Sequence, residues 1–249
     1  MGVMLKSPAE IALMREAGRI VAITLQMVSD AIRPGVVISE LDDLTNKVIG
    51  QHNAKPSFKG YRGFPASICV SINEEVVHGI PATRRLMEGD IVSLDVGAIY
   101  RGWQGDAAVT VGVGKISDQA RKLIDTTRGA LGAGIAAMRP GKHLGDVSWA
   151  VQSYVESRGF SVVKEYVGHG IGRQMHEDPQ IPNFGMPGRG IPLKPGMVLA
   201  IEPMVNVGDW RTRILDDHWT VVTADGSLSA HFEHTVAVTE NEAEILTSL

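Results

Sequence analysis

The second half of this sequence repeats the order of motifs in the first half, and this internal repeat constrains the fold more than any other feature. The segment Ala-Ile-Arg-Pro-Gly at 31–35 returns as Ala-Met-Arg-Pro-Gly at 137–141. The segment 89–95 returns at 196–202, and both copies end in an acidic residue. A repeated unit of this length indicates a duplicated structure whose two copies pack against each other.

The two copies are predicted near residues 8–114 and 117–240, within a single domain that covers 1–249. Ser7 and Glu10 form a capping box at the start of a long amphipathic helix, and a second helix is expected to begin at Ser39. Extended segments follow the helices. The sequence therefore predicts an α/β (α+β) fold with two pseudo-twofold-related halves.

Residues 91–111 predict a β-hairpin that carries Asp95 and Asp106. With the turn centred on Tyr100 and Arg101, the two aspartates would face each other with Cβ atoms roughly 5 Å apart. Two carboxylates that close repel unless a proton or a cation lies between them. From this stretch alone, a solvated pair at a sheet edge is the alternative, although the neighbouring residues are apolar.

Composition excludes several classes of function. The chain has 249 residues, 44% of them hydrophobic, and a net charge of −4, which gives no electrostatic case for nucleic acid or an anionic membrane surface. It lacks an apolar segment of signal-peptide or membrane-spanning length. The single cysteine, Cys69, excludes an intrachain disulfide and fits a reducing compartment, so a cytoplasmic location is expected.

The repeat also supplies a set of candidate metal donors, which the two halves would bring together at their interface. Four buried carboxylates require cations, and an imidazole nitrogen shifts the preference from calcium or magnesium toward manganese, iron, cobalt or zinc. A pair of metal ions is the usual equipment of hydrolases. The alternative is that the acids lie on the surface and the histidine is structural. The donors are Asp95, Asp106, His169, Glu202 and Glu233.

The motifs around these donors resemble those of type I methionine aminopeptidase, a pita-bread metallopeptidase family. They are Leu-Asp-Val-Gly at 94–97, Gly-Asp at 105–106, Gly-His-Gly-Ile-Gly at 168–172, Ile-Glu-Pro at 201–203 and Phe-Glu-His-Thr at 232–235. The resemblance covers nearly the whole chain. It implies a curved antiparallel sheet with outer helices, and removal of the initiator methionine from nascent chains or peptides with a small second residue.

The resemblance also implies roles for the donors and two divalent ions, whose identity as cobalt, manganese, iron or zinc stays open. Asp95 would bind one ion, Asp106 and Glu233 would bridge both, and His169 and Glu202 would complete the other. A hydroxide between the ions would attack the carbonyl that follows the first residue. Glu202 would carry the proton from water to the leaving amine.

Further residues are assigned by the same resemblance. His176 would donate to the developing oxyanion and His78 to the scissile amide. The wall of the methionine pocket would consist of Tyr61, Phe64, Cys69 and Trp219. Read singly, each histidine is more often a structural residue, and Trp219 is explained equally well by packing.

Two positions depart from the family pattern. Met175 stands where an aromatic residue is frequent, and His231 stands where bacterial members carry glutamine, which leaves the exact shape of the pocket and its response to inhibitors open. Members also hold a monovalent cation on backbone carbonyls near Asn73, Glu75 and Ser229. The resemblance implies a monomer without a zinc-ribbon extension. This monomer is expected to meet nascent chains, and through them the ribosome.

Two other functions stay open on the sequence. A proline-directed relative of the prolidase or aminopeptidase P type shares the metal donors, but it usually carries a preceding domain, whereas the first helix here starts near Ser7. A non-catalytic pita-bread binding protein is the second alternative. It is disfavoured because all the donors are present together with His78 and His176.

Overall fold

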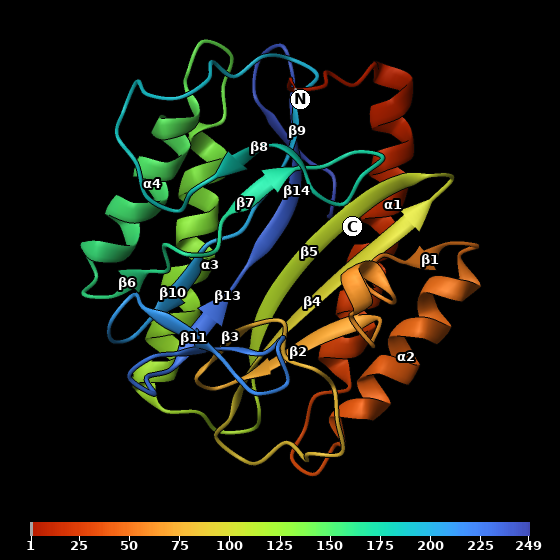
Figure 1. Ribbon diagram of the computed structural model, residues 1–249, viewed down its shortest axis with the longest axis vertical. Coiled ribbons are helices and arrows are strands. Elements are labelled where there is room, and N and C mark those ends of the chain that lie inside the picture. The colour runs from red at the N-terminus through yellow and green to blue at the C-terminus, as the bar shows by residue number, and fades with distance from the viewer. Residues whose placement is uncertain (1) are drawn as a thin grey trace.

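The computed structural model describes residues 2–249, which form four α-helices around a strongly curved antiparallel sheet (Figure 1). The helices are α1 (Pro8–Asp30), α2 (Ile38–Gln51), α3 (Asp118–Ala137) and α4 (Leu144–Glu156), and a 3-10 turn, η1, covers Tyr61–Gly63. The strands of the first half are β1 (Lys55–Pro56), β2 (Ile68–Ile72), β3 (Glu75–Val77), β4 (Ile91–Tyr100) and β5 (Trp103–Gly112).

The second half contributes shorter strands. They are β6 (Ser161–Val162), β7 (Gly168–Gly170), β8 (Glu177–Ile181), β9 (Val198–Ile201), β10 (Met204–Asn206), β11 (Thr212–Ile214), β12 (Val221–Thr223), β13 (Ser229–His231), β14 (Glu233–Val238) and β15 (Ala243–Ile245). No helix within residues 2–249 is long and apolar enough to cross a membrane.

The main sheet joins the two halves at the pair β5 and β14. Its nine strands run in the order β1-β4-β5-β14-β9-β7-β8, with β2 added to β4 and β15 to β14, within residues 2–249. In Figure 1 the helices α1 and α2 lie on one side of the view and α3 and α4 on the other, with these strands between them. Two small three-stranded sheets, β13-β10-β6 and β11-β12-β3, complete the fold. The predicted curved antiparallel sheet with outer helices is confirmed.

Local signals set the helix ends much as the sequence predicts. The Ser7 hydroxyl accepts the Glu10 backbone N–H at 3.4 Å, while the Glu10 carboxylate accepts the Ser7 N–H at 2.9 Å. This pair is the expected capping box of α1. Helix α2 begins at Ile38, one residue before the predicted Ser39. Each helix buries one apolar face, and the buried side chains form a separate core in each half.

The hairpin β4–β5 forms, but the predicted position of its turn is wrong. The turn residues are Arg101 and Gly102, with φ of 49° and 81°, and Tyr100 pairs with Trp103. A two-residue hairpin turn with positive φ at both positions favours glycine at the second, and Gly102 supplies it. Asp95 consequently lies opposite Ala108, not opposite Asp106, which faces Gly97. The two aspartates remain on the same face as diagonal neighbours.

Candidate metal centre

All five predicted donors point from one face of the main sheet. Asp95 lies in β4, Asp106 in β5, His169 in β7 and Glu233 in β14, while Glu202 follows the last residue of β9. Ala108 lies opposite both Asp95 and Glu233, and Ala200 lies opposite His169. Because paired residues share a face and side chains alternate along a strand, this register directs the donors from both halves into one space.

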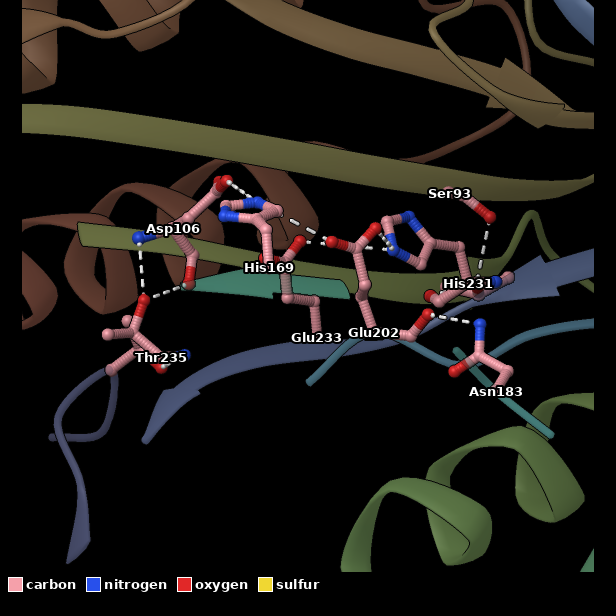
Figure 2. A network of polar contacts seen from close by, with 10 residues as sticks. Ser93, Asp106, His169, Asn183, Glu202, His231, Glu233 and Thr235 are labelled. Carbon is pink, nitrogen blue, oxygen red and sulfur yellow. Dashed lines mark hydrogen bonds and ion pairs between the residues drawn. The ribbon is translucent and has the colours of Figure 1, made fainter. Parts of the chain in front are cut away.

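The donor atoms converge to within a few ångströms. His169 Nε2 lies 3.5 Å from Glu202 Oε1 and 3.9 Å from Asp106 Oδ2 (Figure 2). Donor atoms of Asp106, His169 and Glu233 all lie within 4.8 Å of one another, as do those of Glu202, His231 and Glu233. Among the described residues 2–249, Asp95 belongs to neither of these two groups. Its negative charge nevertheless raises the pKa of Asp106, Glu202 and Glu233.

Burial makes it unfavourable for the four carboxyl groups to carry charge together. Burial raises the pKa of Asp95 to about 7, and it raises the pKa of Asp106 well above its ordinary value, with the charge of Asp95 adding to the effect. Burial and the neighbouring carboxylates likewise raise the pKa of Glu202 and of Glu233. Burial lowers the pKa of His169 to about 3, so this imidazole is neutral at pH 7 and its nitrogen can bind a metal.

Several donor atoms are buried without a hydrogen-bond partner within the described part of the chain. They are Asp95 Oδ1, Asp106 Oδ1, Glu233 Oε1 and His231 Nε2. Buried polar atoms are normally paired, and unpaired carboxylate oxygens next to other carboxylates are especially costly. A divalent cation would satisfy these atoms and offset the charge, and carboxylates with neutral imidazole are a donor set for first-row metals. The residues therefore fit a metal centre.

Neighbouring groups fix the orientation of the donors. The Asp106 backbone N–H donates to Thr235 Oγ1 at 3.0 Å, and the Thr235 hydroxyl donates to the Asp106 carbonyl at 2.8 Å. Nδ1 of His169 lies 2.9 Å from the carbonyl oxygen of Gly170. With the proton on Nδ1, this contact leaves Nε2 free to face the carboxylates, as is usual for metal-binding histidines.

A cavity of about 140 Å³ adjoins the donors. Its apolar wall includes the predicted Tyr61, Phe64, Cys69 and Trp219. Phe64 and Trp219 meet edge to face with ring centroids 5.2 Å apart. Cys69 in β2 lies opposite Asp95 in β4, so the apolar wall and the donor cluster are adjacent in one strand pair.

The two other predicted histidines border the same cavity. The Tyr61 hydroxyl lies 2.8 Å from Nδ1 of His176, and the His176 ring lies 4.2 Å from that of His169 between centroids. His78 has a left-handed backbone with φ of 62°. The next residue, Gly79, can only be glycine, since a Cβ there would lie 2.2 Å from the Val70 carbonyl oxygen.

Every predicted site residue thus lines the cavity, and the structure adds residues that sequence reasoning did not assign. Phe58 and Arg62 also line it, and Met175 occupies the wall as its position next to His176 suggests. The sequence marks His231 only as a departure from a family pattern, yet the structure places it among the candidate metal donors. Arg62 adjoins Tyr61 in η1, and this adjacency was the available signal for it.

A curved antiparallel sheet with a buried carboxylate and imidazole cluster is typical of metal-dependent hydrolases, and comparison with known proteins identifies the family. The chain matches metallopeptidase family M24 over residues 12–240. It is 54% identical to "Methionine aminopeptidase 1" of Bacillus subtilis, a match that covers 97% of this chain and 98% of the relative.

Solved structures agree with this match. The crystal structure of methionine aminopeptidase from Thermotoga maritima superposes with a TM-score of 0.98 at 51% identity, covering 100% of both chains. The prolidase from Pyrococcus furiosus has a TM-score of 0.81 at 23% identity, covering 98% of this chain and 65% of the other, a likeness that shows the pita-bread fold. The chain belongs to metallopeptidase family M24, within its methionine aminopeptidases.

Proposed function

We propose that this chain removes the N-terminal methionine from peptides and nascent proteins whose second residue is small. The observation that carries this proposal is the direct contact between an apolar cavity and the donor cluster, through the opposed Cys69 and Asp95. An unbranched apolar side chain in the cavity would place the following carbonyl at the donors. Relatives above 50% identity that carry the name methionine aminopeptidase support the same substrate.

The metal donors in this proposal are Asp95, Asp106, His169, Glu202 and Glu233, holding two divalent ions. When bound, such ions supply Lewis-acid activation of water and of the scissile carbonyl. The proposal includes the predicted assignment of these residues. Asp95 would bind one ion, Asp106 and Glu233 would bind both, and His169 and Glu202 would bind the other. A monovalent cation near Asn73, Glu75 and Ser229 belongs to the proposal as well; the Ser229 N–H donates to the Asn73 carbonyl at 2.8 Å.

The proton transfers are assigned to side chains at the rim of the cluster. Glu202 takes the proton from the attacking water and passes it to the leaving amine, because it lies at the end of β9 beside His169 and its pKa is raised by burial. His176 donates from Nε2 to the developing oxyanion while Nδ1 accepts from Tyr61. His78 donates to the scissile amide.

Tyr61, Phe64, Cys69 and Trp219 hold the methionine side chain in this mechanism. The apolar rings exclude water from the cavity without offering a hydrogen bond, which suits a thioether. We propose further that residues 1–249 act as one catalytic domain, that the enzyme is a cytoplasmic monomer, and that it meets its substrates as they leave the ribosome.

The test uses metal-stripped protein titrated separately with cobalt, manganese, iron(II) and zinc. Release of methionine from Met-Ala-Ser, with little cleavage of Ala-Pro peptides, is expected. Preference for the Ala-Pro peptides would instead favour a prolidase-type function. Cleavage of neither peptide with any of the metals would favour a non-catalytic binding protein.

A further inference from the structure

His231 is a buried donor that the mechanism above leaves unused. Its side chain is 1% exposed, and its Nε2 has no hydrogen-bond partner among the described residues. This nitrogen lies 3.9 Å from Glu202 Oε2 and 3.8 Å from Glu233 Oε2. Leaving a buried nitrogen without a partner is unfavourable, so its position calls for a ligand.

The backbone of His231 is held as firmly as that of the predicted metal ligand Asp106. The His231 N–H donates to Thr110 Oγ1 at 2.9 Å, and the Thr110 hydroxyl donates to the His231 carbonyl at 2.7 Å. Thr235 makes the same two bonds to Asp106. The hydrogen bonding thus fixes both residues in place and leaves their side chains free to bind something else.

These two arrangements are related by symmetry. Glu233 lies opposite Ala108 in the central strand pair, and a twofold axis through that pair carries Asp106 onto His231 and Thr110 onto Thr235. His231, the last residue of β13, therefore occupies the position in the second half that Asp106 occupies in the first. The register also places both side chains on the face that bears the other donors.

The distances distinguish a shared ion from a hydrogen bond. A hydrogen bond from nitrogen to oxygen measures about 2.7–3.2 Å, whereas two ligands bound to one ion at about 2.0–2.2 Å lie roughly 3–4 Å apart. His231 Nε2 meets its carboxylates at 3.8 and 3.9 Å, and His169 Nε2 meets its own at 3.5 and 3.9 Å. In Figure 2 the two imidazoles flank the Glu202 carboxylate, one beside each oxygen.

We propose that Nε2 of His231 is a metal ligand, which binds a divalent cation together with Glu202 and Glu233. The centre then contains two imidazole ligands, His169 and His231, one on each side of Glu202. The sequence motifs imply only one. This inference rests on the proposed function, since it requires the same carboxylates to hold divalent ions. A second imidazole favours cobalt, zinc or iron over manganese, because nitrogen donors suit those ions better.

The number of coordinated histidines can be counted in the wild-type protein loaded with cobalt(II). Each imidazole bound through Nε2 keeps a proton on Nδ1, and the paramagnetic ion shifts that proton's NMR resonance far downfield. Two shifted resonances that disappear in deuterium oxide are expected, from His169 and His231. Both rings are buried, which slows exchange enough for the signals to be seen.

Two variants assign the second resonance. His231→Gln keeps a polar side chain of similar size but cannot supply the imidazole, so one resonance should disappear and cobalt affinity should fall at least about tenfold by calorimetry. Manganese affinity should fall less. His234→Gln is the matched control, because His234 adjoins Glu233 but its Nδ1 lies 2.8 Å from Thr247 Oγ1, outside the donor groups. This control should keep both resonances.

The outcomes separate this inference from the proposed function. A single shifted resonance in wild-type protein, unchanged in His231→Gln with unchanged cobalt affinity, would overturn the role of His231 and leave the peptidase proposal standing. No cobalt binding by wild-type protein would overturn both. The number of shifted resonances in the wild-type protein tests the role of His231 even if His231→Gln does not fold.

Discussion

The Tyr61 hydroxyl and Nδ1 of His176 are 2.8 Å apart, and the two rings stack with centroids 5.4 Å apart and an interplanar angle of 22°. This contact links η1 of the first half to the segment between β7 and β8 of the second. If the tyrosine donates to Nδ1, the His176 proton is held on Nε2, which can then donate to an oxyanion. In the proposed mechanism the pocket wall would thereby set the tautomer of His176.

Removing that hydroxyl should slow turnover more than it weakens substrate binding. Tyr61→Phe keeps the stacked ring but loses one hydrogen bond, so kcat for Met-Ala-Ser should fall about tenfold with KM changed little. Steady-state kinetics measure both values. In a His176→Ala background the same change should have no further effect, and a full additional loss there would show that Tyr61 acts independently of His176.

The buried ion pair between Lys6 and Glu177 should stabilise the segment that carries His176. Lys6 Nζ lies 2.7 Å from Glu177 Oε2, and the two side chains are 3% and 6% exposed. Lys6→Met would leave the Glu177 charge buried and unpaired, which should lower the free energy of unfolding by about 3 kcal/mol. Urea denaturation measures the loss.

A matched control exists on the surface. Arg15 and Glu244 form a pair at the same 2.7 Å, but their side chains are 50% and 36% exposed. Because water screens that pair, Arg15→Met should cost less than about 1 kcal/mol. Equal losses from the two substitutions would contradict a special role for the buried pair.

Metal-free protein should lose stability through Asp95 as the pH rises. Burial raises the pKa of Asp95 to about 7 from an ordinary value of 3.8, so between about pH 4 and 7 the folded chain keeps a proton that the unfolded chain has released. The stability that this proton provides is complete below about pH 4 and is lost as the pH rises through about 7. Asp95→Asn should therefore become progressively more stable than wild type across this window.

Denaturation of both proteins in a chelator, at several pH values, measures that difference. Comparing the two proteins largely cancels the opposite contribution of the buried histidines, whose lowered pKa values favour folding as the pH rises. A saturating divalent metal should reverse the order, because the cation binds the charged carboxylate and displaces its proton. A difference that does not depend on pH would contradict the effect of burial on Asp95.

Trp219 should act on substrate binding and not on the metal. It packs edge to face on Phe64 at 5.2 Å, and Trp219→Ala would enlarge the methionine cavity. We expect kcat/KM for Met-Ala-Ser to fall about 10- to 100-fold, mainly through KM, with cobalt affinity unchanged. Trp210→Ala is the control, since that ring contacts Lys164 and Arg211 away from the cavity. A similar loss in both variants would point to destabilisation instead.

The sequence predicted much of the fold because its signals are local or repeated. The capping box of Ser7 and Glu10 depends on residues three apart, and it forms where it is expected. The hairpin was predicted with its turn one residue too early, because the alternation of strand residues does not mark the turn, whereas the positive φ required at Gly102 does. The resulting register differs by two residues, which preserves the face on which each aspartate lies.

The sequence by itself determined five candidate donors and their order, because the repeat and the spaced motifs name Asp95, Asp106, His169, Glu202 and Glu233 without any structure. Only the tertiary structure decided which atoms meet. The pairing of β13 with β10, in which His231 lies opposite Met204, brings His231 beside Glu202, and Lys6 meets Glu177 across 171 residues of sequence. Such contacts depend on packing between distant segments, for which a single sequence carries no local signal.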